Sequence, residues 1–222
     1  MILSQTHQST LASAAPPADV CNFVQPSGEA KSFSNKPPDG GSPACLAIDI
    51  VINDEDWSAF ADPVFGDSEA IVTAAAHAVA LWPALNPVPS TVTIALSCDA
   101  EVAQLNGTFR GKLMPTNVLS FPDGGHPGNE DSKAPRSLGD LIIARETVLA
   151  EAADLHIPVG NHLAHLVVHG LLHLLGYDHE TDCEADRMEA LETSILATLD
   201  IPNPYADSDP VTVGLQHLDG GF

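Results

Sequence analysis

The sequence predicts a single α/β domain in which a small mixed four-stranded sheet is covered by helices. Apolar, strand-like segments alternate along the chain with amphipathic, helix-like segments, and no internal repeat is apparent. Hydrophobic residues make up 44% of the 222 residues and aromatic residues only 5%, so aliphatic side chains must form most of the core. A chain of this length suits one domain of ordinary size.

The chain is expected to have three parts. Residues 1–45 are rich in Ser, Pro and Gly and lack apolar periodicity, which is typical of a disordered extension. We expect the domain at 46–199 and a flexible tail at 200–222. The first residues lack the pattern of a secretory signal, and no stretch approaches the roughly 20 apolar residues of a membrane span. A cytoplasmic protein without membrane contact is therefore expected.

Local patterns predict the elements of the domain. Apolar and β-branched runs predict strands at 46–54, 90–98, 117–122 and 138–145. Helical patterns predict helices at 67–81, 99–105, 146–155, 160–175 and 182–199. Asp67 or Ser68 is expected to cap the first of these helices, and Asp99 the second. The Glu and Asp residues from Glu180 to Glu192 are expected to form a solvated face of the last helix.

The strongest chemical signal is the segment HLAHLVVHGLLHLLGYDHE at 162–180. His169 and His173 are four residues apart, which places them about 40° apart around a helix and therefore on one face. Gly176 can end that helix in a left-handed conformation, so that the reversed chain brings His179 back. Three imidazoles leave the fourth position of a tetrahedral zinc ion open, as in catalytic sites. The sequence thus predicts one Zn²⁺ per chain.

Neighbouring residues leave two alternatives at this segment. His162 and His165 precede the pair, so the helix could simply carry a histidine-lined face, but only the set 169, 173 and 179 satisfies HxxxHxxGxxH. The Asp178 carboxylate could accept a hydrogen bond from the outer N–H of an imidazole and so orient the ring, or it could cap the turn.

The same spacing occurs in zinc peptidases with the pattern HExxHxxGxxH. In those enzymes a glutamate follows the first histidine and serves as the general base, whereas this chain has Gly170 at that position. The sequence therefore predicts a peptidase-like metal site without the usual peptidase chemistry.

The charge of the chain is strongly acidic. Eight Lys and Arg against 30 Asp and Glu give a net charge of −22, which argues against a broad surface that coats nucleic acid. The residues between 110 and 145 depart from this balance, since they contain five of the eight basic residues: Arg110, Lys112, Lys133, Arg136 and Arg145. Either these residues form a locally cationic surface, or they are ordinary loop residues that keep the chain soluble.

Three segments resemble the motifs of the YbeY family of bacterial metal-dependent endoribonucleases and ribosomal RNA maturation factors. They are HGLLHLLGYDH at 169–179, LNGTFRGKLMPTNVLSFP at 105–122 and LGDLIIA at 138–144. They occur in the family's order, and the resemblance covers roughly 46–198. It implies three zinc ligands at His169, His173 and His179 and a functional arginine at Arg110. One departure is Leu113, where the family usually has an acidic residue.

The resemblance also implies a function. It implies cleavage of single-stranded RNA during 3′-end maturation of small-subunit (16S) ribosomal RNA and in ribosome quality control, with the small ribosomal subunit as partner and no DNA substrate. Physically, a guanidinium such as that of Arg110 matches the charge that builds on a cleaved phosphodiester. The simpler alternative for Arg110 is a surface salt bridge.

Further residues are assigned roles on weaker grounds. Lys112 and Asn117 are expected to bind substrate, and Asp140 is expected either to support a ligand or to satisfy a turn. Two other functions stay open: a zinc hydrolase acting on a peptide or a small molecule, and a ribosome-assembly protein with a structural metal.

Overall fold

The computed structural model describes residues 46–82, 88–123 and 135–206. The expected extension at 1–45 and the part of the expected tail beyond 206 lie outside these ranges, so the division of the chain into three parts stays a prediction. None of the helices in the described ranges is long and apolar enough to cross a membrane.

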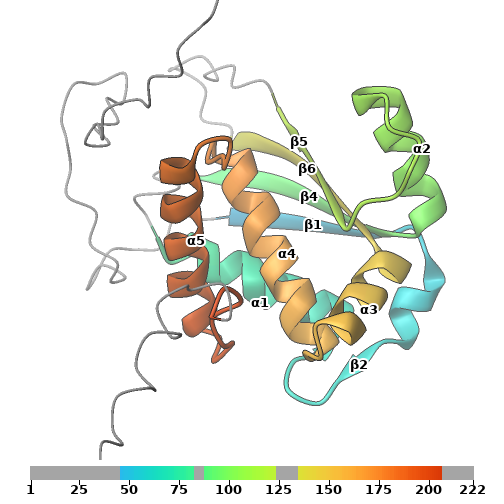
Figure 1. Cartoon of the computed structure of the whole chain (residues 1–222), viewed down its shortest axis with the longest axis horizontal. Coiled ribbons are helices and arrows are strands. Elements are labelled where there is room, and N and C mark those ends of the chain that lie inside the picture. Colours follow the sequence, from blue (N-terminus) through green and yellow to red (C-terminus); the bar gives the residue numbers. More distant parts are fainter. Residues whose placement is uncertain (1–45, 83–87, 124–134, 207–222) are drawn as a thin grey trace, which may run out of the picture. The chain divides into compact units, whose positions relative to one another are not determined.

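The centre of the fold is a four-stranded mixed sheet, as the sequence predicts (Figure 1). Its strands are β1 (Leu46–Ile52), β4 (Ser90–Ser97), β6 (Arg136–Ala144) and β5 (Val118–Pro122), in that spatial order. The first three are parallel to one another, and β5 runs antiparallel to β6 at one edge. Helices connect the parallel strands, which confirms the predicted single α/β domain.

A second, two-stranded sheet was not predicted. It consists of β2 (Ala61–Asp62) and β3 (Gly66–Asp67) and follows the short 3-10 helix η1 (Glu55–Ala59). Two-residue strands are too short to produce an alternating sequence pattern, so sequence inspection has no signal for them.

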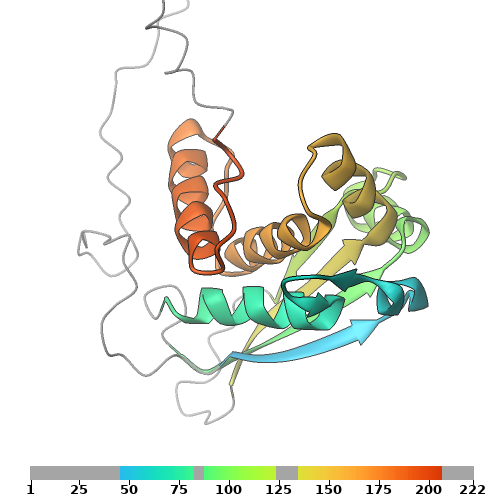
Figure 2. The ribbon, with the colours of Figure 1, turned by 90° about the horizontal axis from the view of Figure 1, so that it is seen from below.

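The two faces of the sheet carry different helices. Alternate residues of a strand point to opposite faces. Leu141 and Ile143 of β6 pack in the main core, whereas Ile142 contacts a smaller cluster around Val102 and Leu119. The main core includes residues of α1 (Ser68–Ala80), α4 (Val159–Leu174) and α5 (Asp182–Ala197), and the smaller cluster lies under α2 (Asp99–Arg110). Figure 2 shows α1 and α4 lying along the sheet, with α5 beyond them.

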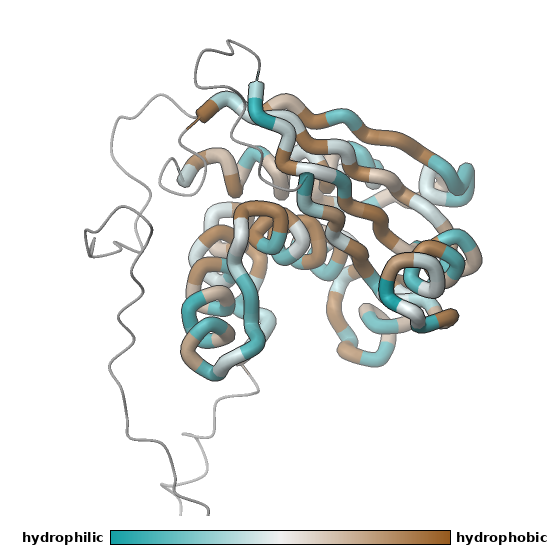
Figure 3. Tube along the Cα trace, turned by 90° about the horizontal axis from the view of Figure 1, so that it is seen from above, coloured by the Kyte–Doolittle hydropathy of each residue, from teal (hydrophilic) through white to brown (hydrophobic). Residues whose placement is uncertain are grey.

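Apolar segments run through the centre of the described fold, and hydrophilic segments gather at its outer turns (Figure 3). The largest fully buried side chains come mainly from the strands and from α4 and α5, including Ile94, Leu141, Leu171 and Ile195. The aliphatic core that the low aromatic content predicts is therefore present.

The helix starts and ends agree with the sequence at most positions. The Asp67 side chain accepts the backbone N–H of Ala70 at 2.8 Å and caps α1 as predicted. The helix α3 (Arg145–Asp154), like α4 and α5, lies within two residues of its predicted bounds.

The prediction was wrong for α2, which runs five residues beyond the expected end at Leu105. Asn106 and Gly107 do not break it, because the Asn106 side chain donates to the Met114 carbonyl and Leu113 packs close to Gly107. The helix ends instead at Gly111, which has φ 71°. Asp99 is not the cap either, since its carboxylate accepts the N–H of Thr147 on α3. The longer helix makes Arg110 its last residue.

Candidate metal centre

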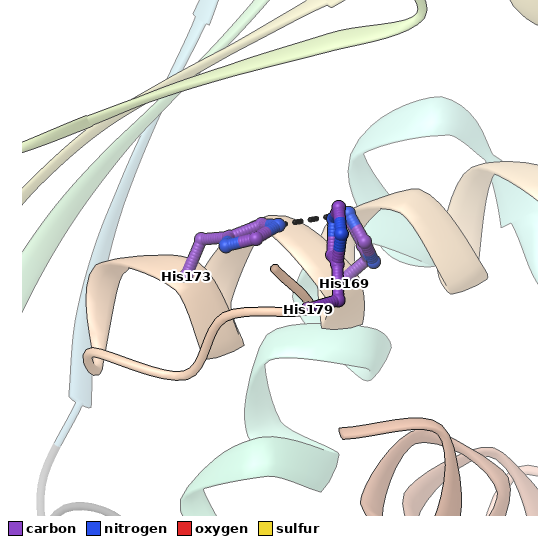
Figure 4. A group of neighbouring side chains, drawn as sticks. All are labelled: His169, His173 and His179. Carbon is purple, nitrogen blue, oxygen red and sulfur yellow. Dashed lines mark hydrogen bonds between the residues drawn. The ribbon is translucent and has the colours of Figure 1, made fainter. Parts of the chain in front are cut away.

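Three imidazoles converge at the C-terminal end of α4 (Figure 4). His169 and His173 lie on consecutive turns of the helix, and His179 returns from the turn that follows. One ligand-capable atom from each ring lies within 4.8 Å of the others, and the Nε2 atoms of His169 and His173 are 3.0 Å apart. A tetrahedral ion with bonds of 2.0–2.1 Å separates its ligand nitrogens by about 3.3 Å. The spacing fits such an ion.

This cluster consists of the three histidines that the sequence pattern selects. Among the residues that the structure describes, no other group of three His, Cys, Asp or Glu side chains is arranged in this way. His165, which lies four residues before His169 and could form the same kind of pair with it, instead directs its Nε2 atom at the Glu192 carboxylate. His162 directs its Nε2 atom at Glu151.

The turn after α4 is what brings His179 back. Gly176 has φ 92°, a left-handed conformation that glycine adopts without strain. The N–H of Gly176 donates to the His173 carbonyl at 3.0 Å, and the N–H of Tyr177 donates to the Leu172 carbonyl at 3.0 Å. These two bonds form the Schellman motif, which reverses the chain. The predicted helix end at Gly176 is therefore confirmed.

The residues around His179 hold this turn in place. The Asp178 carboxylate accepts the backbone N–H of His179 at 2.8 Å, so this bond serves the turn rather than an imidazole. A capping box between Thr181 and Glu184 then begins α5 directly afterwards. This bond is the one that the turn-capping alternative describes, and a role of Asp178 in orienting an imidazole stays a prediction.

The outer nitrogens of two rings are bound by acceptors. The Nδ1 atom of His169 lies 2.8 Å from a carboxylate oxygen of Glu192, and the Nδ1 atom of His173 lies 3.0 Å from the Tyr177 carbonyl. Because both partners accept, a neutral ring carries its proton on Nδ1 and turns the lone pair of Nε2 toward the centre. The 3.0 Å contact between the two Nε2 atoms, dashed in Figure 4, is a hydrogen bond only when one ring carries a second proton, which a bound metal ion would displace. The His179 side chain is exposed, and its ring makes no hydrogen bond within the described ranges.

Burial also keeps His173 neutral. The pKa of His173 is lowered, first by burial and then by the neighbouring His169 and His179. A histidine must be neutral to bind a metal. The surroundings of this ring therefore favour the form that a ligand requires.

Glu192 is the functional residue that the sequence analysis missed. It was expected on a solvated face of α5, but it is fully buried, so that prediction was wrong. Its carboxylate accepts hydrogen bonds from His169, His165 and the Tyr205 hydroxyl. Burial alone would raise the pKa of Glu192, but these three donors lower it to about 2.

A periodic signal for Glu192 was present in the sequence. Met188, Leu191 and Ile195 are buried and recur at helical spacing, and Glu192 lies four residues after Met188 on the same face. The many acidic residues around this position hid the pattern.

The residues that follow α5 complete these surroundings. Ile201 is buried, and Tyr205 reaches Glu192 and His165, so residues of the expected tail contact the site. A cavity of about 230 Å³ adjoins the histidines, lined by His169, His179, Ala185, Met188, Glu189, Glu192 and Tyr205.

Arg110 is connected to the histidine helix through β5. Its Nη2 atom donates to the Ser120 carbonyl at 3.5 Å, and the Ser120 hydroxyl donates to the Gly170 carbonyl at 3.4 Å. Gly170 directly follows His169. No carboxylate in the described ranges lies within ion-pair distance of Arg110, so the salt bridge considered for this residue is not formed there.

Within the described ranges, the side chains of the other expected site residues either have partners away from the histidines or have no hydrogen-bond partner. Lys112 is exposed. Asn117 donates to the Glu151 carboxylate at 3.0 Å and accepts the N–H of Val118 at 2.7 Å, which ties the start of β5 to α3. Asp140 is exposed on β6, opposite Phe121 in register. None of the three hydrogen-bonds to the histidine cluster within the described ranges, and their roles stay predictions.

Gly170 has a packing role that explains its lack of a side chain. A Cβ atom there would lie 2.9 Å from Cδ2 of Leu141 and 3.1 Å from its Cδ1. The position therefore faces the sheet, and glycine lets α4 lie close against it. A glutamate base at this position would meet buried Leu141.

The fold and this cluster define an α/β protein with a candidate three-histidine metal centre. The family model described as Endoribonuclease YbeY matches residues 64–200. The chain belongs to this family, which confirms the resemblance of its three motifs.

Named relatives agree with this assignment. An "Endoribonuclease YbeY" of Rhodopseudomonas palustris (strain BisB18) is 45% identical over 165 residues, covering 74% of this chain and 95% of that protein. A protein of the same name from Dinoroseobacter shibae is 44% identical over 173 residues, covering 73% of this chain and 92% of that protein. A solution structure from Thermotoga maritima covers 74% of this chain and 98% of that chain, with 23% identity and a TM-score of 0.42, a likeness too low to add to the assignment.

Proposed function

We propose that this protein is a cytoplasmic, zinc-dependent endoribonuclease that cleaves single-stranded RNA. We propose further that it acts in 3′-end maturation of 16S ribosomal RNA and in ribosome quality control, with the small ribosomal subunit as its partner. Family membership and the name of the relatives support the reaction. The single observation that carries the proposal is the convergence of His169, His173 and His179 beside a cavity.

The histidines would hold the ion through nitrogen atoms that already face one point. Three neutral imidazoles leave one position of a tetrahedral ion open, and zinc commonly takes such ligands. When bound, zinc supplies a Lewis acid that stabilises charge on a phosphate oxygen or lowers the pKa of water to about 7. The protein's own part is to direct the Nε2 atoms of His169 and His173 inward.

Arg110 is proposed to bind the charged phosphate of the scissile bond. A guanidinium donates two parallel hydrogen bonds to non-bridging oxygens and so stabilises the charge that builds during cleavage. Arg145 shows the contrasting arrangement, because Asp54, Asp56 and Glu146 accept its hydrogen bonds at 2.6, 3.1 and 3.4 Å. Arg110 has no such partner in the described ranges, so its donors are available to an RNA phosphate.

Lys112 is proposed to contact a neighbouring phosphate, since it lies two residues after Arg110 and is exposed. Asn117 is proposed to support substrate binding by holding the start of β5, because Glu151 already accepts its amide. Both assignments concern affinity for RNA rather than the chemical step.

The test is to incubate zinc-loaded protein with single-stranded RNA and, separately, with a peptide library. We expect RNA cleavage, its loss on chelation and its return when zinc is added back. His173→Ala should reduce cleavage to background, because it removes a ligand from the helix.

Arg110→Ala should also lose cleavage, and Arg136→Ala is its matched control, since Arg136 is an exposed cation of the same 110–145 segment and its loss should reduce cleavage far less. Cleavage of peptides but not RNA would replace the proposal with a hydrolase of another class. RNA binding without zinc-dependent turnover would indicate an assembly protein with a structural metal.

A further inference from the structure

We propose that Glu192 is a positioning residue of the metal centre, whose buried carboxylate holds the His169 ring in the orientation and tautomer that direct Nε2 at the ion. This inference rests on the metal centre of the proposed function but not on its substrate. Nothing in the family match assigns a role to this residue.

The placement of Glu192 is unfavourable unless the carboxylate has a task. The residue is fully buried on the apolar face of α5, beside Met188 and Leu191. Burying a carboxylate is costly even when it is paired, and an apolar side chain of similar volume is often at least as stabilising in such a place. A leucine-like residue would therefore serve the core equally well.

Every oxygen of this carboxylate is used. Oε1 accepts from Nδ1 of His169 at 2.8 Å, and Oε2 accepts from Nε2 of His165 at 2.9 Å and from the Tyr205 hydroxyl. The donors come from α4 and from the residues after α5. Glu192 is thus fixed from two sides and cannot turn away from His169 without losing several bonds.

The bond to His169 decides which nitrogen is available for a metal. An ionised carboxylate only accepts, so the proton of the neutral ring must be on Nδ1 and the lone pair on Nε2. Carboxylate partners of this kind also raise the basicity of the ligating nitrogen. The Nδ1 atom of His173 is bound by the Tyr177 carbonyl, so within the described ranges His169 is the one helical ligand whose Nδ1 atom has an anionic partner.

Tyr205 and His165 contribute by holding Glu192. The Tyr205 hydroxyl also lies 3.2 Å from Nε2 of His165, so the two residues and the carboxylate form a closed triangle. Tyr205 therefore links the residues after α5 to the metal centre, although it does not itself contact His169 through a hydrogen bond.

The decisive variant is Glu192→Gln, which keeps the size of the side chain and removes its charge. Zn²⁺ affinity of the full-length chain is measured by competition with a chromophoric chelator, without RNA. We expect binding about 10–100-fold weaker than in the original chain. Nitrogen-15 NMR of the metal-free protein should show His169 protonated at Nδ1 in the original chain and shifted toward Nε2 protonation in the variant.

Glu189→Gln is the matched control. Glu189 lies one turn earlier on α5 and lines the same cavity, but it makes no hydrogen bond to a histidine of the described ranges. Glu189→Gln removes one negative charge, as Glu192→Gln does, but leaves the bond to His169 intact, so we expect Zn²⁺ affinity within threefold of the original chain. An equal weakening in both variants would show that net charge matters rather than the bond to His169, and the inference would be wrong.

Tyr205→Phe supplies an independent measurement should Glu192→Gln fail to fold. It removes one donor to Glu192 and leaves the ring, so we expect a smaller, several-fold loss of Zn²⁺ affinity and a partial change of the His169 tautomer. Unchanged affinity and tautomer in Tyr205→Phe, or affinity within threefold in a folded Glu192→Gln, would overturn the inference. Absence of RNA cleavage by an original chain that binds zinc normally would instead count against the proposed function alone.

Discussion

The histidine cluster and the region around Arg110, at the end of α2, differ in how firmly their side chains are held. His169 and His173 each have a fixed partner behind the ring, and Glu192 in turn has three donors. The Arg110 side chain makes one hydrogen bond with the described residues, at 3.5 Å. Binding an ion requires nitrogen atoms that are already in place. A long, variable strand of RNA can instead be met by side chains that move to fit it.

The exposure of the side chains also differs between these two regions. In the region around Arg110, the neighbouring Phe109, Leu113 and Met114 are 65%, 80% and 60% exposed, and Phe109 contacts the ring of Phe121. Apolar side chains left open beside unpaired cations suit a partner that carries both bases and phosphates. In the histidine region, by contrast, even the carboxylate of Glu192 is buried.

The cationic surface expected over 110–145 is smaller than its sequence count implies. Arg145 is engaged by three carboxylates, and Lys133 lies outside the described ranges. Within the described part of that segment, the basic side chains left without a carboxylate partner are Arg110, Lys112 and Arg136. In a chain with a net charge of −22, electrostatic attraction of RNA would then be local rather than general.

The largest effect that separates the two regions is expected from Arg110→Ala. Loss of one donor to developing charge typically costs about 2.7–4 kcal/mol, so RNA cleavage should fall about 10²–10³-fold. Zn²⁺ affinity should stay unchanged, because the Arg110 side chain makes no hydrogen bond to a histidine of the described ranges. Single-turnover cleavage and chelator competition on the same preparations measure the two quantities.

Arg110→Lys should recover only part of this loss, since an ammonium lacks the planar pair of donors. A fall of Zn²⁺ affinity in Arg110→Ala comparable to the fall in cleavage would show that the two regions are not independent. Their different rigidity would then have no functional meaning.

The histidine region could be predicted largely from sequence because its determinants are local. A spacing of four residues and one glycine place His169, His173 and His179 through helix geometry and a standard turn. Glu192 and Tyr205 could not be placed in this way, since they meet His169 and His165 across separations of 23 and 40 residues. Only the packing of α5 on α4 brings them together.

The Arg110 region was less predictable for a different reason. Its position depends on where α2 ends, and the expected end at Leu105 would have left Arg110 in a loop. The helix continues because Asn106 is satisfied by the Met114 carbonyl, a contact with a residue eight positions later. Resemblance to a family, rather than spacing, is what indicated Arg110 at all.

A middle-sized effect is expected where the two regions meet, at Gly170. Gly170→Ala places a Cβ atom 2.9 Å from Leu141, and overpacking of this kind costs typically 1–3 kcal/mol, of which the better helix propensity of alanine offsets up to about 1 kcal/mol. We expect a lower free energy of unfolding in urea denaturation. Zn²⁺ affinity should fall less than in Glu192→Gln, because no ligand or partner is removed.

Leu141→Val removes the branch that the new Cβ atom would meet. In the double variant of Gly170→Ala and Leu141→Val, the loss in free energy of unfolding should be smaller than the sum of the losses in the two single variants. Additive losses would show that the Ala methyl group is accommodated elsewhere, and that the closeness of α4 to the sheet does not depend on Gly170.

The smallest effect concerns the paired arginine, Arg145, as the counterpart of Arg110. The pKa of Asp54 is lowered chiefly by its hydrogen bond from Arg145. A carboxyl whose pKa is lower in the folded state contributes stability above its unfolded value, about 3.9, and loses it as pH falls through the folded value. Asp54→Asn should therefore lower the free energy of unfolding by up to about 1 kcal/mol near neutral pH.

This difference between Asp54→Asn and the original chain should begin to shrink as pH falls below about 4, where the carboxyl is protonated in the unfolded chain, and should vanish below the lower pKa of the folded state, where it is protonated in both. Arg110→Ala should show no such pH-dependent difference in urea denaturation, because no carboxylate pairs with it in the described ranges. If Arg110→Ala instead loses stability with the same acid dependence, Arg110 is paired with a carboxylate in solution. It would then belong with Arg145 as a structural cation, and its guanidinium would have to leave that partner before it could bind a phosphate.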